Sequence, residues 1–150
     1  HPVTVKYVQI IQRQVQRVLM ESELFGALLH FRPDIFDGDD CFVLETFTEV
    51  QDIVGTNLDV QAEEPSLRVK LSPYLLKIVF SAILIPPSSL DPRAGLRCRR
   101  ENDGCVLEFG WTGAVAPLPP KFLWADRLLQ RFGARLQVVP GFLHVICPVA

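Results

Sequence analysis

The chain has 150 residues and a net charge of −2, with 49% hydrophobic and 21% charged residues. This composition is typical of a packed globular domain, with or without a short appendage, and excludes a disordered chain. The lack of a basic surplus argues against nucleic acid as a partner. No apolar run reaches the length of a membrane span, so no membrane segment is expected.

A long amphipathic helix is predicted from Thr4 to about Phe31. The Arg32-Pro33 pair ends it, because the residue before a proline is disfavoured in the helical region. At ~1.5 Å per residue the helix would extend about 40 Å, more than the core of a small domain needs. Its apolar residues follow the three–four spacing of a coiled-coil seam and predict a homodimer or a helical partner: Val8, Ile11, Val15 and Val18.

An acidic loop from Asp34 to Asp40 follows this helix, and the predicted domains are therefore residues 1–33 and 34–150. The loop does not fit a calcium site, because Phe36 and Gly38 stand where ligands are needed. The next predicted elements are a short strand, a short helix opened by a Thr48-to-Gln51 capping pattern, and two further strands. They cover Cys41–Leu44, Glu49–Val54, Leu58–Ala62 and Leu67–Leu71.

Ser72 is the predicted N-cap of a second long helix, with Pro73 at its first position. This helix is apolar nearly all round and is therefore expected to be buried, and Pro86-Pro87 stops it. A hairpin, a helix ended by a left-handed Gly133, and a second hairpin complete the chain. They cover Ala94–Arg100 with Cys105–Gly110, Phe122–Phe132, and Leu136–Val139 with Phe142–Cys147.

The cysteines and histidines show no metal-ligand spacing, and no metal or other cofactor is expected. Four reduced thiols and the lack of a signal-peptide pattern favour the cytoplasm. Cys98 and Cys105 flank the first hairpin turn and can lie close together, although two ordinary strand residues are the favoured interpretation. His30 is interpreted as a helix-end residue and His144 as a strand-face residue.

Four segments follow one another in an informative order: Tyr7–Leu19, Leu75–Ile85, Val106–Gly113, and Leu128–Leu136 with Val145–Pro148. Together they resemble the C-terminal half of a sensor histidine kinase. In that family the first segment is the second helix of the dimerisation hairpin, and the others belong to the GHKL-type ATP-binding domain. The resemblance implies an α/β (α+β) two-layer sandwich whose mixed sheet is backed by about three helices and preceded by a long N-terminal helix.

The residues that the family uses to bind nucleotide are replaced in this sequence. In that family an aspartate binds the adenine amino group, and the corresponding residue here is Trp111. An indole N–H donates hydrogen bonds but cannot accept them. Two asparagines that hold the nucleotide and its magnesium fall at Ser81 and Ile85, and an isoleucine side chain offers magnesium no ligand. Only Thr112 and Gly113 are retained, and a plain turn after a strand is an equally good interpretation of that pair.

The loop that should cradle the phosphates is also altered, because Ala114–Pro120 is rich in proline, which has no N–H to donate. Trp111 can fill the space left by adenine, which we favour, or it can be exposed and anchor a partner. None of the three histidines falls where the resemblance places the phosphoacceptor, which belongs to a helix upstream of this segment.

The sequence therefore predicts a non-catalytic pseudokinase in two-component signalling that acts through dimerisation and protein contacts, with a response regulator as a candidate partner. The alternative is the C-terminal part of a sensor histidine kinase or phosphotransferase whose phosphoacceptor helix lies outside this chain. A third possibility is a binding module of another class.

Overall fold

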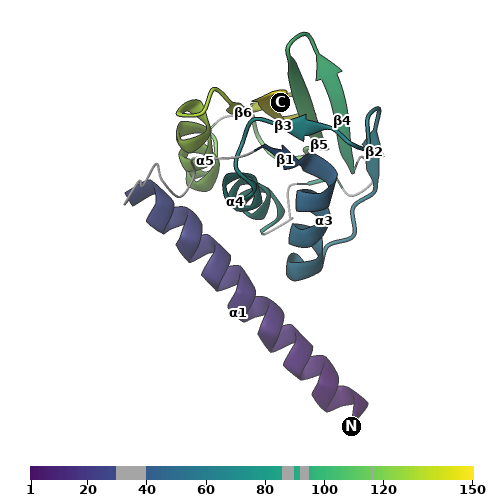
Figure 1. Ribbon diagram of the computed structural model, residues 1–150. Coiled ribbons are helices and arrows are strands. Elements are labelled where there is room, and N and C mark those ends of the chain that lie inside the picture. Colours follow the sequence, from purple (N-terminus) through teal and green to yellow (C-terminus); the bar gives the residue numbers. More distant parts are fainter. Residues whose placement is uncertain (30–39, 86–89, 92–94, 116) are drawn as a thin grey trace.

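The computed structural model describes residues 1–29, 40–85, 90–91, 95–115 and 117–150 (Figure 1). Several sequence predictions fall outside these residues. They are the helix end at Arg32-Pro33, most of the acidic loop, the helix-end role of His30, the stop at Pro86-Pro87 and the boundary between residues 33 and 34.

The described residues form four helices and seven strands. In chain order these are α1 (Pro2–Leu29), β1 (Cys41–Phe42), α3 (Val43–Val54), β2 (Val60–Ala62), β3 (Arg68–Val69), α4 (Pro73–Leu84), β4 (Leu96–Glu101), β5 (Gly104–Gly110), α5 (Pro120–Gln130), β6 (Arg135–Val139) and β7 (Phe142–Pro148).

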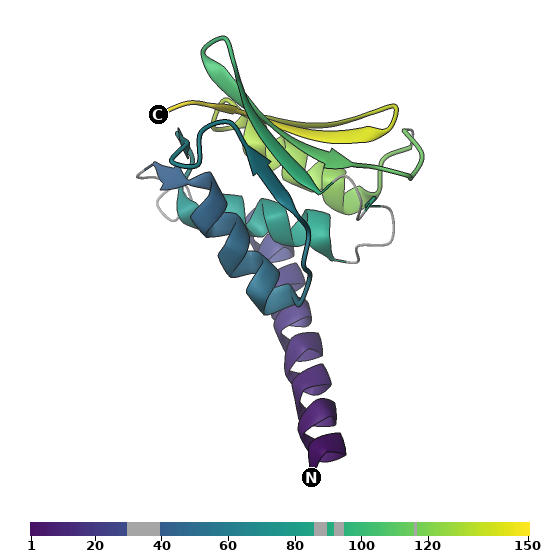
Figure 2. The same cartoon turned by 90° about the vertical axis from the view of Figure 1, so that its right-hand side faces the viewer.

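The main sheet has five strands in the order β2-β4-β5-β7-β6, and β1 pairs with β3 in a separate two-stranded sheet. The β2–β4 pair is parallel and the other ladders are antiparallel, so the sheet is mixed as predicted. Helices α3, α4 and α5 lie against one face of this sheet (Figures 1 and 2). The C-terminal part of α1 lies on the far side of these helices, and its N-terminal part extends beyond the domain. The predicted fold class is confirmed.

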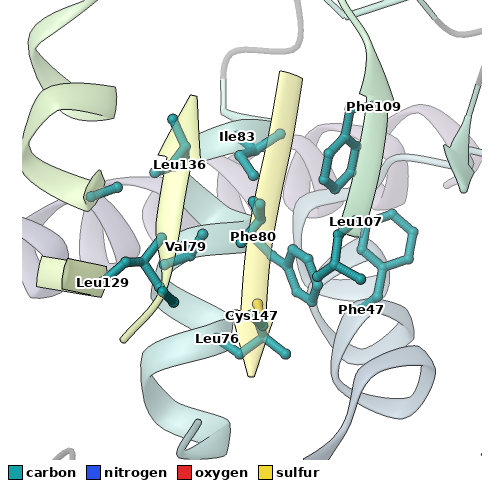
Figure 3. Close-up of a cluster of buried hydrophobic side chains, with 14 of the residues drawn as sticks. Phe47, Leu76, Val79, Phe80, Ile83, Leu107, Phe109, Leu129, Leu136 and Cys147 are labelled. Carbon is teal, nitrogen blue, oxygen red and sulfur yellow. The ribbon is translucent and has the colours of Figure 1, made fainter. Parts of the chain in front are cut away.

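The core lies between the sheet and these three helices, where alternate strand residues meet the apolar helix faces (Figure 3). Three phenylalanines from α3, α4 and β5 form its aromatic centre. The rings of Phe47 and Phe80 are 5.1 Å apart in an edge arrangement, and the ring of Phe109 lies 5.9 Å from Phe47 and 6.2 Å from Phe80. Such contacts fix how the helical layer sits on the sheet.

Helix α4 begins where the sequence predicts. The Ser72 hydroxyl oxygen accepts a hydrogen bond of 3.1 Å from the Leu75 backbone N–H, and Pro73 occupies the first turn. The helix is buried over most of its surface because it lies between the sheet on one side and α1 on the other.

We expect Ser72→Ala to lower the free energy of unfolding by about 1 kcal/mol, because the Leu75 N–H would lose its cap. Urea denaturation followed by circular dichroism measures this loss. Ser66→Ala, in an exposed turn, is the matched control and should change stability by less than about 0.5 kcal/mol. Equal effects of the two substitutions would contradict the capping role.

Helix α3 differs from its prediction. It begins at Val43 rather than Glu49, so the predicted strand is reduced to Cys41–Phe42 and the Thr48-to-Gln51 capping pattern is wrong. The reason is the helical spacing of the buried residues Val43, Phe47 and Val50, whose packing outweighs the β-propensity of the first turn.

Gln51 has another role than the predicted one. Its side-chain oxygen accepts a hydrogen bond of 2.7 Å from the Leu58 N–H, and its amide donates to the Leu58 carbonyl at 3.3 Å. The side chain therefore fixes the connection between α3 and β2.

Two strands are shorter than predicted. Of Leu67–Leu71 only Arg68–Val69 is a strand, and it lies outside the main sheet, while Leu58–Ala62 shortens to Val60–Ala62. Both predicted hairpins are present, and Gly133 has a φ of 76°, in the left-handed region expected after α5. That helix starts at Pro120 and ends at Gln130. In the described part of the chain, none of the helices combines the length and apolar character needed to cross a bilayer.

Candidate functional site

Trp111 lies directly after β5 and is buried, with 7% of its surface exposed. Its backbone N–H donates a 2.9 Å hydrogen bond to the Gly141 carbonyl, and its indole ring contacts the Phe122 ring edge-on at 5.2 Å. The indole N–H donates to the Ala114 carbonyl at 3.3 Å. The ring is thus held inside the domain, and its donor is used within its own loop.

Gly113 lies close against this ring. A Cβ at this position would meet the indole carbons at 2.8 Å, so a larger residue would require the ring to shift. Thr112, between them, is exposed. The Thr-Gly pair that the sequence retains therefore forms the bend that closes over the indole.

Ser81 and Ile85 occupy the last turn and the C-cap of α4, and they are 4% and 1% exposed. The Ser81 hydroxyl donates a 2.6 Å hydrogen bond to the Lys77 carbonyl. The Ile85 carbonyl accepts a hydrogen bond from the ammonium group of Lys121, which also lies 5.1 Å from the centre of the Phe122 ring. Lys121 therefore connects the end of α4 to the start of α5.

The residues that the resemblance assigns to the nucleotide site lie in two separate places in the structure. Ile85, Trp111 and Gly113 are joined around the first turn of α5, through Lys121 and Phe122. Ser81 instead borders a cavity of about 280 Å³ between α1, α3 and α4. The cavity is lined by Gln16, Leu19, Ile53, Tyr74, Lys77, Ile78 and Ser81.

The long N-terminal helix contributes Gln16 and Leu19 to the lining of this cavity, together with Lys77 and Ser81 of α4. The Lys77 ammonium pairs with the Glu49 carboxylate of α3 at 2.6 Å. Farther along, the Arg13 side chain of α1 packs against Gly55, at the C-terminal end of α3. One side of α1 is thus docked on the domain.

The predicted seam lies on another side of α1. Val8, Ile11, Val15 and Val18 are between 46% and 61% exposed. Isolated exposed apolar residues are ordinary, but these share one helix face at coiled-coil spacing. Among the described residues of the domain, none covers this seam.

Lys121 and Phe122 were not predicted as site residues. The sequence shows only a cation and an aromatic residue after a proline-rich loop, and their role depends on α5 starting beside the end of α4. His144 is on the outer sheet face, where its Nε2 lies 2.8 Å from the Glu108 carboxylate. Arg99 approaches the same carboxylate at 3.4 Å. The positive charge of Arg99 therefore balances the negative charge of Glu108 within this cross-strand cluster.

Among the described residues, no group of three or more histidine, cysteine, aspartate or glutamate side chains is arranged to hold a metal ion. The polar groups at the end of α4 are a serine hydroxyl and a backbone carbonyl, both already hydrogen-bonded within the protein.

Comparison with solved structures identifies the fold. The catalytic domain of histidine kinase ThkA, in a nucleotide-free form, matches with a TM-score of 0.54 at 12% identity, over 76% of this chain and 96% of that one. The cytoplasmic segment of histidine kinase QseC matches with a TM-score of 0.54 at 11% identity, over 91% of this chain and 93% of that one. No protein-family model and no curated protein matches the sequence. The resemblance to a histidine-kinase ATP-binding module is therefore confirmed as a likeness of fold.

Proposed function

We propose that this chain is a non-catalytic, histidine-kinase-like module of two-component signalling that works through dimerisation and protein contacts. The observation that carries the proposal is the burial of the three side chains at the positions that the resemblance assigns to nucleotide binding. Trp111 and Ile85 are packed inside the domain, and Ser81 faces the docked helix α1. A nucleotide would have to displace the indole and separate Lys121 from the Ile85 carbonyl.

The chemistry of the replaced residues supports the same conclusion. Magnesium is held by oxygen ligands, and at the two asparagine positions the chain offers an isoleucine and a serine whose hydroxyl is bonded to its own helix. An adenine amino group needs an acceptor, and the Trp111 indole supplies only a donor.

We expect no measurable binding of ATP with magnesium. Titration calorimetry should give no saturable heat up to about 1 mM nucleotide, which corresponds to a binding free energy weaker than about −4 kcal/mol. A histidine-kinase catalytic domain that binds ATP, measured in the same buffer, is the positive control. A dissociation constant in the low micromolar range would contradict the proposal and favour the phosphotransferase.

The partners belong to this proposal as well. The exposed seam of Val8, Ile11, Val15 and Val18 fits a second copy of α1 or a helix of another protein. A response regulator is the partner expected of a histidine-kinase-like protein, and a cytoplasmic location follows from the same role.

The alternative function is the C-terminal part of a sensor kinase or phosphotransferase whose phosphoacceptor helix lies outside this chain. The uncovered seam supports this alternative, because the other helix of a dimerisation hairpin would cover those four residues. It differs from the first proposal in requiring nucleotide binding, so the calorimetric experiment separates the two.

A further inference from the structure

Three helices contribute side chains to the cavity that Ser81 borders. On α4 the lining residues are spaced three or four positions apart and therefore share one face of the helix: Tyr74, Lys77, Ile78 and Ser81. Helix α1 adds Gln16 and Leu19, and α3 adds Ile53. The cavity is thus a joint feature of the N-terminal helix and the domain.

The apolar part of this lining is incompletely covered. Leu19 is 57% exposed, whereas Ile78 is 3% exposed, and Ile53 and Tyr74 are half-buried. Packed protein interiors hold few voids larger than a water molecule, so a space of about 280 Å³ leaves these side chains without full contact. An apolar molecule in the cavity would remove their surface from water, which is favourable in proportion to the area buried.

The charged group of the lining is already paired within the protein. Of the residues that line the cavity only Lys77 carries a charge, and its ammonium pairs with the Glu49 carboxylate at 2.6 Å. The Ser81 hydroxyl donates to the Lys77 carbonyl. A charged ligand would have to compete with Glu49 for Lys77 or lose its hydration without a new partner. An uncharged ligand has neither cost.

The volume of the cavity indicates the size of such a ligand. An engineered cavity of about 150 Å³ lined by leucine, isoleucine and phenylalanine binds benzene, and the present space of about 280 Å³ is larger. The Tyr74 ring offers an aromatic contact. We propose that this cavity binds a small, uncharged aromatic molecule of two fused rings, about the size of indole.

Such a ligand would join α1 to the domain. Only the C-terminal part of α1 lies on the other helices (Figures 1 and 2). A molecule that contacts Leu19 together with Ile53 and Tyr74 makes all of its contacts only while α1 is docked. Binding therefore stabilises the docked arrangement, because a ligand favours the state to which it binds better. This site goes beyond the proposed function, since it requires neither a nucleotide nor a partner protein.

The test is a titration of the folded, ¹⁵N-labelled wild-type chain with indole, followed by ¹H–¹⁵N NMR spectra. We expect saturable shifts with a dissociation constant of about 0.1–1 mM, as for a ligand of this size. The shifts should include the amides around Leu19 of α1, Ile53 of α3 and Lys77 of α4. Indole-3-carboxylate, which adds a negative charge to the same rings, should bind at least about tenfold more weakly.

Matched variants place the ligand. Leu19→Ala shortens a lining side chain, and Val18→Ala shortens its neighbour of similar exposure on the seam. The first should raise the dissociation constant of indole at least about threefold, because apolar contact area is lost, and the second should leave it unchanged. Ile53→Trp should fill the cavity and remove binding, with folding checked by circular dichroism.

Four results would overturn the proposal. They are a wild-type protein without saturable shifts up to the solubility limit of indole, tighter binding of indole-3-carboxylate than of indole, equal effects of Leu19→Ala and Val18→Ala, and shifts confined to one of the three helices. The first, second and fourth are read on the wild-type protein, so they do not depend on a variant that fails to fold.

Discussion

Replacing Trp111 with alanine is expected to lower the free energy of unfolding by about 3–5 kcal/mol, the usual cost of removing a buried tryptophan. The indole is 7% exposed and packs between Gly113 and the Phe122 ring. Its removal would leave a cavity at the junction of β5 and α5 and would also free the Ala114 carbonyl from its hydrogen bond. Urea denaturation monitored by far-ultraviolet circular dichroism measures this loss.

Leu123→Ala is the matched control, because Leu123 lies on α5 next to Phe122 but is exposed. Its effect should stay below about 0.5 kcal/mol, as for other surface substitutions. If Trp111→Ala costs less than about 1 kcal/mol, the indole does not fill the domain interior, and the partner-anchoring interpretation of Trp111 gains support.

The second large effect is expected at the α1 seam. If the seam joins two copies of the chain, Ile11→Glu combined with Val15→Glu should raise the dimer dissociation constant by at least about 1000-fold. Burying each such side chain contributes roughly 1.5–3 kcal/mol, and every 1.4 kcal/mol corresponds to a factor of about ten. The double substitution removes two of the four seam residues from each chain and places like charges opposite one another.

Light scattering coupled to size-exclusion chromatography over about 1–500 μM distinguishes the two states, since dimer population depends on concentration. The control is Gln9→Glu with Ile10→Glu, which adds the same charge at exposed positions of α1 that point away from the seam, at b and c of its heptad. A wild-type protein that stays monomeric throughout this range, or a folded double variant that remains a dimer, would contradict self-association through the seam.

Elements with a local signal are the ones the sequence predicts well. Helix α4 carries its cap, its first-turn proline and its apolar surface in consecutive residues, and both hairpins carry a turn residue between alternating strands. Helix α3 is only partly predicted, because its first turn is also rich in strand-forming residues and its helical state depends on packing Val43 and Phe47 into the core.

The candidate site is likewise predictable only in part from the sequence. Trp111, Ser81 and Ile85 can be selected from the sequence, because the resemblance supplies the chemistry that each position should have. The contacts that these residues and their neighbours make cannot be predicted in this way, because they join residues far apart in the chain. Lys121 reaches the Ile85 carbonyl only once α4 and α5 lie side by side, and Gln16 reaches the Ser81 side only once α1 has docked.

The strand order of the main sheet also bears on how the chain folds. Its β4–β5 and β6–β7 pairs are hairpins whose strands are joined by very short turns, so their loops close at little entropic cost. The β5–β7 ladder instead joins strands separated by α5 and β6, and the parallel β2–β4 ladder requires a crossover through α4. Such nonlocal pairings slow folding. The β5–β7 and β2–β4 ladders therefore raise the contact order of the fold above that of its two hairpins, and we expect the chain to fold more slowly than a helical bundle of the same length.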